Sequence, residues 1–141
     1  MKYKAHLVFI SIVLLSFACE KDDKEQTSCD QKTIISKSEY DTAPLDDVSI
    51  LDMEIDGDCL KISFSASGCD GSTWIVKLID SGMTFYTSPP QKDLILSLEN
   101  NELCDAVISK EISFDIENLQ VSGNLVVLNI INTGDEILYE F

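Results

Sequence analysis

The sequence predicts an all-β protein, a small antiparallel β-sandwich of about eight strands. Two observations carry this prediction. Apolar and polar residues alternate over several short runs, as in Leu60-Lys61-Ile62-Ser63-Phe64, which is the period of a strand with one buried face. Turn-forming residues separate these runs at intervals of roughly 8–15 residues, a spacing typical of sandwiches and barrels. The best helical candidate after the N-terminal segment, residues 103–110, has little support.

The strand-like runs follow one another along most of the chain. Asp56-Gly57-Asp58 and Asn132-Thr133-Gly134-Asp135 have the composition of hairpin turns. Pro89 and Pro90 exclude residues 88–92 from a central strand, because proline lacks the amide donor that a β-ladder needs. The expected runs cover residues 48–55, 60–66, 74–79, 94–98, 104–108, 112–116, 125–131 and 137–141, with a short apolar piece at 83–86.

The turn at residues 67–74 is the organising feature of the sequence. It contains Gly68, Cys69, Gly71 and the only tryptophan, Trp74. We expect it to join two core strands, with Trp74 buried on the apolar face of the second. The protein has the size of an immunoglobulin domain but not its motif. Trp74 lies only five residues after Cys69, and Glu102 stands where the corner tyrosine would be.

The N-terminus has the form of a secretory signal. Lys2 and Lys4 precede an apolar segment, residues 7–17, of ~11 residues, which is too short to span a bilayer. The run Leu15-Ser16-Phe17-Ala18-Cys19 resembles a lipobox, where the chain is cut before a cysteine that carries lipid. Ser16 replaces the usual leucine, and the alternative is ordinary cleavage nearby that leaves Cys19 as a fifth thiol.

Three segments follow from this assignment: residues 1–18 are the signal peptide, residues 19–44 are the lipidated cysteine, tether and N-terminal arm, and residues 45–141 are the β-sandwich domain. Residues 20–26 are wholly polar and predict a disordered tether. Their acidic character resembles the signals that sort lipoproteins of some Gram-negative bacteria to the cell surface; a generic solvated linker and a periplasm-facing protein are the alternatives. Within the arm, Ile34-Ile35 predicts a short edge strand.

The protein is strongly acidic, with a net charge of −15. All 25 acidic residues but only eight of the ten lysines follow Cys19, so the mature side chains carry −17, and arginine is absent. A chain without a basic patch is repelled by nucleic acid and by anionic membrane surfaces. We therefore expect no nucleic-acid partner, and membrane contact only through lipid on Cys19.

The remaining four cysteines predict two disulfides, because exported chains favour disulfides. Of the three possible connectivities, Cys59–Cys69 is disfavoured, since ten residues of extended strand separate the two by ~30 Å. Of the other two we prefer Cys69–Cys104 with Cys29–Cys59. Free buried thiols are the alternative.

Several short motifs together resemble a group of small bacterial lipoproteins of uncharacterised function. The resemblance covers about residues 45–141, and it implies a β-rich lipoprotein without assigning any catalytic residue. The motifs are Ser67-Gly68-Cys69-x-Gly71-x-x-Trp74, Ser88-Pro89-Pro90-Gln91-Lys92, Glu102-x-Cys104, Ser113-Phe114-Asp115 and Ile137-Leu138-Tyr139-Glu140-Phe141.

Composition excludes several chemistries. The only histidine, His6, lies in the signal peptide, so the mature protein cannot carry Ser-His-Asp or Cys-His catalysis or a histidine-bearing zinc site. Carboxylates remain, but they are too abundant to nominate a catalytic pair. Acidic loops with Asp46, Asp47, Asp56, Asp58 and Asp70 suit calcium, although solvated loops are the simpler interpretation and no metal or cofactor is expected.

The function that fits these observations is a non-catalytic module, displayed at the bacterial outer membrane, that binds a protein or glycan partner or serves as an accessory subunit. The alternative is a carboxylate-based hydrolase such as a glycosidase. Two carboxyl groups converging in a cleft would favour the hydrolase. Exposed aromatic side chains among Tyr40, Phe85 and Tyr86 would favour sugar or protein binding. Binding residues and oligomeric state do not follow from the sequence.

Overall fold

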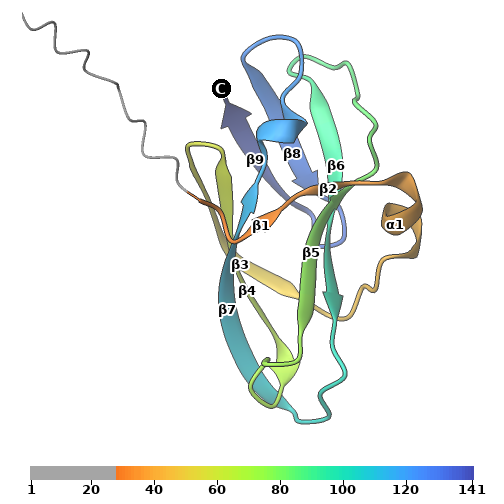
Figure 1. Cartoon of the computed structure of the whole chain (residues 1–141), viewed down its shortest axis with the longest axis vertical. Coiled ribbons are helices and arrows are strands. Elements are labelled where there is room, and N and C mark those ends of the chain that lie inside the picture. Colours follow the sequence, from red (N-terminus) through yellow and green to blue (C-terminus); the bar gives the residue numbers. More distant parts are fainter. Residues whose placement is uncertain (1–27) are drawn as a thin grey trace, which may run out of the picture.

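The computed structural model describes residues 28–141, which form two β-sheets with little helix (Figure 1). The predicted signal peptide, Cys19 and the polar run after it lie outside the described residues. The elements in chain order are β1 Gln31–Lys32, β2 Ile34–Ile35, α1 Lys37–Thr42, β3 Ser49–Asp56, β4 Cys59–Gly68, β5 Ile75–Asp80, β6 Gln91–Glu99, β7 Ala106–Asp115, the 3-10 helix η1 Glu117–Leu119, β8 Leu125–Ile130 and β9 Asp135–Glu140.

The strands form a four-stranded sheet in the order β1-β7-β4-β3 and a five-stranded sheet in the order β2-β5-β6-β8-β9. The prediction of an all-β fold is therefore confirmed. Most long neighbours are antiparallel, but β6 and β8 run parallel, as do the short strands β1 and β2 with β7 and β5. Parallel pairing of β6 with β8 is possible because the chain crosses through β7 and η1 between them.

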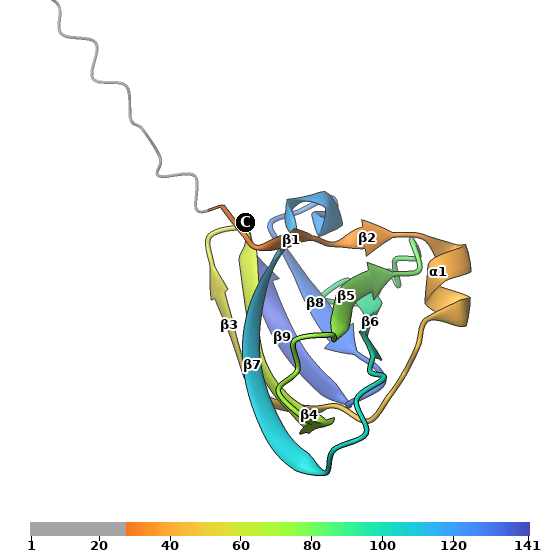
Figure 2. The ribbon, with the colours of Figure 1, turned by 60° about the horizontal axis from the view of Figure 1, so that its bottom comes forward.

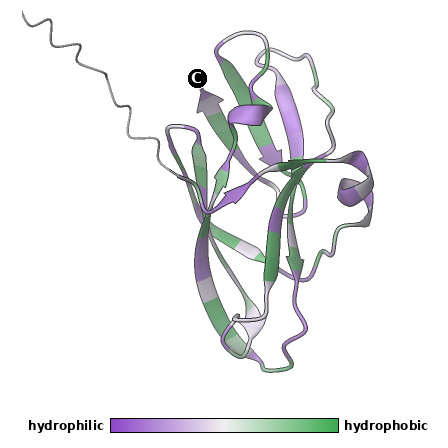
Figure 3. Ribbon diagram, in the orientation of Figure 1, coloured by the Kyte–Doolittle hydropathy of each residue, from purple (hydrophilic) through white to green (hydrophobic). Residues whose placement is uncertain are grey.

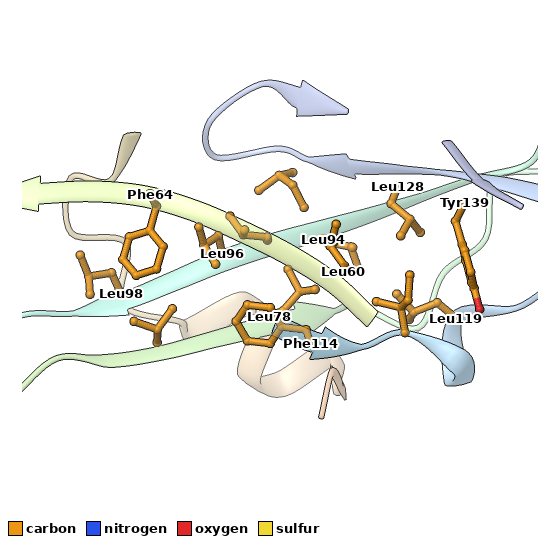
Figure 4. Close-up of a cluster of buried hydrophobic side chains, with 14 of the residues drawn as sticks. Leu60, Phe64, Leu78, Leu94, Leu96, Leu98, Phe114, Leu119, Leu128 and Tyr139 are labelled. Carbon is orange, nitrogen blue, oxygen red and sulfur yellow. The ribbon is translucent and has the colours of Figure 1, made fainter. Parts of the chain in front are cut away.

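The hydrophobic core fills the space between the two sheets (Figure 4). Alternation along β4 and β7 turns Leu60, Phe64 and Phe114 inward, and the facing strands supply Leu78, Leu96 and other aliphatic side chains. These residues have no exposed surface. Burial alternates along β4, which is the property that the period of two predicted, whereas residues 94–98 of β6 are buried on both faces.

The N-terminal arm belongs to both sheets, although we expected the β-domain to begin near Leu45. Figures 1 and 2 show residues 31–42 passing from the β7 edge to the β5 edge and then into α1. The amide of Thr33 donates to the Asp115 carbonyl at 3.1 Å, and that of Ser36 donates to the Asp80 carbonyl at 2.9 Å. Ile34 and Ile35 do form a short edge strand, as predicted.

Helix α1 was not predicted. It is only six residues long, and the Ser36 side chain caps it by accepting a hydrogen bond from the Glu39 amide at 3.3 Å. Within residues 28–141 no helix is long and apolar enough to cross a membrane.

Strand β7 is continuous, whereas the sequence predicted two runs, 104–108 and 112–116, and offered 103–110 as a helical candidate. The apolar alternation is interrupted because Lys110, opposite Phe64 in the register, is on the core-facing side. Its ammonium lies 5.4 Å from the Trp74 ring centroid, which makes a charged residue acceptable there. The short apolar piece at 83–86 forms one isolated bridge, between Phe85 and Gln91.

Candidate functional site

The predicted organising turn is held by a single carboxylate. Glu102 Oε2 accepts hydrogen bonds from the amides of Cys69, Asp70 and Gly71 at 2.6, 3.1 and 2.9 Å. Glu102 Oε1 accepts from the Thr73 amide at 3.4 Å and from its hydroxyl at 3.0 Å. Successive amides that point at one anion form a nest, here filled by a side chain of the same protein.

The glycines of this turn leave room for the carboxylate. A Cβ on Gly68 would lie 2.6 Å from Glu102 Oε2 and 2.8 Å from Trp74 Cζ2. Gly71 has a φ of +69°, a conformation that other residues rarely adopt. The turn is therefore built around Glu102 and the indole, which indicates a structural role.

The environment of Glu102 keeps it ionised. Burial raises the pKa of this carboxyl group, but hydrogen bonds from Gly71, Cys69 and Thr73 outweigh burial and lower the pKa from 4.5 to about 2. Because the folded pKa lies below the unfolded one, Glu102 stabilises the fold above pH 4.5 and loses this effect as the pH falls toward 2.

Replacing Glu102 by glutamine is expected to remove part of the acid sensitivity of the protein. At pH 7 the melting temperature of Glu102→Gln should lie below that of the wild type, and the difference should shrink between pH 4.5 and 2 as the wild-type carboxylate is protonated. Thermal unfolding followed by circular dichroism at several pH values measures this. A difference that stays constant down to pH 2 would contradict the assignment.

Both predicted disulfides are present. Cys69 is bonded to Cys104, which joins the turn to the segment that carries Glu102, and Cys29 is bonded to Cys59, which ties the arm to β4. Cys19, the predicted lipidation site, lies outside the described residues.

Trp74 is less buried than expected. It packs against the edge of the core, with its ring centroid 6.2 Å from that of Phe64, but it is half-buried because it precedes β5 and lies at the turn. Lys110 covers it and donates a hydrogen bond to the Gly71 carbonyl.

Other carboxylates have structural partners as well. Asp80 pairs with Lys92 at 2.7 Å in the interior, and Asp58 accepts from the Tyr139 hydroxyl. Burial, together with this bond to Asp58, raises the pKa of Tyr139 to about 12. The aspartates weighed as calcium ligands are divided among three places: Asp46 and Asp47 precede β3, Asp56 and Asp58 lie at the β3–β4 turn, and Asp70 follows β4. Residues 28–141 hold no group of three acidic, cysteine or histidine residues placed to bind a metal ion.

The outer surface of the five-stranded sheet carries a different set of side chains. Phe85 pairs with Gln91, Gln91 with Val127, and Val127 with Leu138, so these four residues form one row across the sheet. The next row contains Asp93, Asn129 and Glu136. The alternate residues, such as Leu94 and Leu128, point into the core. We call the surface formed by Phe85, Gln91, Asp93, Val127, Asn129 and Leu138 the Asn129 face.

A hydrogen-bonded trio lies at the centre of the Asn129 face. Asn129 Nδ2 donates to Gln91 Oε1 at 3.2 Å and to Asp93 Oδ1 at 3.0 Å. Among the described residues, three side-chain atoms of the trio have no protein partner: Asn129 Oδ1, Gln91 Nε2 and Asp93 Oδ2. Hydrogen-bond donors and acceptors therefore remain available. Figure 3 shows the start of β6, where Gln91 and Asp93 lie, as a hydrophilic stretch followed by a hydrophobic one.

Aromatic residues also lie in this part of the fold. Phe85 is 43% exposed, and Tyr86, in the same loop, is 88% exposed. Tyr40 of α1 is half-buried; burial raises its pKa, and the negative charges of Asp93, Asp80 and Asp41 raise it further. The three aromatics singled out in the sequence therefore fall around the start of β6, which the sequence alone could not establish.

The comparisons with known proteins support the fold alone. No protein-family model and no curated protein matches the chain. A crystal structure of a protein of unknown function, DUF1344, from Bacteroides vulgatus is similar, with a TM-score of 0.50 and 24% sequence identity. The alignment covers 79% of this chain and 56% of that one, so this chain spans little more than half the length of its structural neighbour.

Proposed function

We propose that this protein is a non-catalytic binding module, exported and held by lipid on Cys19 at the bacterial outer membrane, where it binds a protein or glycan partner. The observation that carries the binding role is the Asn129 face. It combines exposed aromatic and aliphatic side chains with side-chain hydrogen-bond donors and acceptors that have no partner among the described residues. Surfaces of this composition are typical of recognition sites.

Export is supported by the two disulfides, because such bonds form and persist in oxidising compartments. Anchoring is supported by the lipobox-like run that ends at Cys19. A mature chain of charge −17 is repelled by anionic headgroups, so lipid would have to supply the attachment. Each buried methylene contributes ~0.8 kcal/mol, and stable anchoring takes more than one lipid chain.

The hydrolase alternative has less support. A glycosidase needs two carboxyl groups ~5–9.5 Å apart that face a substrate. Here Glu102 is surrounded by turn amides, Asp80 is paired with Lys92, and Asp58 is bound to Tyr139. A carboxylate that is already saturated by structural donors is poorly suited to proton transfer.

The anchoring part of the proposal is tested with Cys19→Ala in the native host. Wild-type protein should fractionate with membranes and remain there after a high-salt wash, whereas the variant should be released. A variant that stays with washed membranes would contradict lipid anchoring. Cleavage of the wild type by protease added to intact cells should demonstrate surface display; protection, under conditions that cleave the purified protein, would favour the periplasmic side.

A further inference from the structure

We propose that the Asn129 face binds a neutral glycan chain, with Phe85 as the stacking surface and Asn129, Gln91 and Asp93 as the groups that bind hydroxyls. This inference rests on the proposed binding function and names its ligand class and site. Glycan binding does not depend on the membrane anchor, so the glycan-binding proposal and the anchoring proposal can each be refuted without the other.

The chemistry of the trio matches adjacent sugar hydroxyls. A hydroxyl both donates and accepts hydrogen bonds, and a pair of them is best met by neighbouring donors and acceptors on one surface. The side-chain oxygens Asn129 Oδ1 and Asp93 Oδ2 can accept, and the side-chain nitrogen Gln91 Nε2 can donate. The bonds from Asn129 to Gln91 and Asp93 fix the orientation of all three side chains before a ligand arrives, which lowers the entropy cost of binding.

The position of Phe85 matches the apolar side of a sugar ring. The Phe85 amide donates to the Gln91 carbonyl at 2.8 Å, and the Gln91 amide donates to the Phe85 carbonyl at 2.9 Å. Residues paired in this way place their side chains on the same face of a sheet. The ring of Phe85 therefore lies beside Gln91, where the C–H face of a sugar could stack while its hydroxyls contact the trio.

Charge selects among glycans. Asp93 and Glu136 lie in the second row of the sheet surface, and Lys92, which stands between Gln91 and Asp93 in the sequence, is turned inward to Asp80. The fixed charges of this row are thus negative, and the protein as a whole carries −15. Sulfated and uronic-acid polymers would be repelled, so the negative charge of this surface favours neutral glycans over anionic ones.

The outer surface of the four-stranded sheet offers a contrast. Ser49, Ser65 and Ser109 form a row across β3, β4 and β7, and the neighbouring row contains Asp52 and Glu111. The paired residues of these rows include no aromatic side chain. This surface supplies matched controls for substitutions on the Asn129 face.

The test is affinity electrophoresis of the full-length protein in detergent, in gels containing soluble neutral polysaccharides: β-glucan, galactomannan, xylan and α-mannan. Uronic-acid and sulfated polysaccharides are run in parallel to test the effect of negative charge on the ligand. At least one neutral polysaccharide should retard the wild type, and the anionic polymers should not. Phe85→Ala and Asn129→Ala should each weaken binding about tenfold or more. The controls Leu51→Ala, an exposed aliphatic residue of β3, and Ser65→Ala should leave it unchanged.

Three results would overturn the proposal: no retardation by any neutral polysaccharide, retardation by anionic polymers alone, or retardation that survives both Phe85→Ala and Asn129→Ala. Unchanged melting temperatures of the two variants would establish that loss of binding is not loss of folding. Membrane fractionation of the same variants should match that of the wild type. Absence of glycan binding would therefore not change the conclusion about lipid anchoring.

Discussion

Replacing Cys69 and Cys104 together by alanine is expected to lower the free energy of unfolding by about 4 kcal/mol. The bond spans 35 residues of sequence, and a loop of that length restricts the unfolded chain strongly in the chain-entropy model. Both cysteines are exposed, so their truncation leaves no cavity in the core. Urea unfolding of the double variant and of the oxidised wild type measures the difference. A change of less than about 1 kcal/mol would show that the bond does little for the fold.

The contribution of Glu102 to stability is expected to depend on the Cys69–Cys104 disulfide. Without the disulfide, the segment that carries Glu102 is tied less firmly to the amides of Cys69, Asp70 and Gly71. Glu102→Gln should therefore cost less stability in the disulfide-free protein than in the wild type. Equal costs in the two backgrounds would mean that the carboxylate and the disulfide hold the turn independently.

Replacing Lys92 by methionine is expected to lower the free energy of unfolding by about 3–5 kcal/mol. The Lys92 and Asp80 side chains are 7% and 0% exposed, and methionine would leave the Asp80 carboxylate buried without its counter-ion. Asp80 also accepts a hydrogen bond from the Gly82 amide at 3.0 Å, which cannot compensate for the lost cation. Denaturant unfolding at pH 7 gives the value.

Two further variants separate the buried charge from side-chain size. Lys37→Met removes an exposed partner of Asp41 and should cost no more than about 1 kcal/mol. Asp80→Asn combined with Lys92→Met removes both charges, keeps an acceptor for Gly82, and should recover much of the lost stability. A double variant as unstable as Lys92→Met alone would point to packing as the cause.

The strands with one buried face were predictable because burial on one face imposes the period of two, as on β4 and β9. The parallel neighbours β6 and β8 were not, since a crossover leaves no local signal. The arm was placed outside the domain because Gln31 and Lys32 are polar; their pairing with β7 depends on backbone bonds and on Cys29. Lys110 obscured β7 because one charged residue on the inner face breaks the pattern.

Reach along the strand excluded one disulfide connectivity, and of the other two the preferred one is present. Phe85 and Tyr86 could also be singled out as candidate contact residues. The Asn129 face could not be assembled from the sequence. Asn129 lies 36 residues after Asp93, and only the parallel register brings the two together. The role of Glu102 was also missed, although its place two residues before Cys104 means that the predicted bond to Cys69 carries it to the turn.

The attachment of the module is the central claim, and mass spectrometry of the mature N-terminus tests it most directly. Protein purified from membranes of the native host should begin at Cys19, and its N-terminal peptide should carry the mass of a diacylglyceryl group on the sulfur and an acyl chain on the amine. A mature chain that begins at another residue, or that contains Cys19 without lipid, would contradict the account.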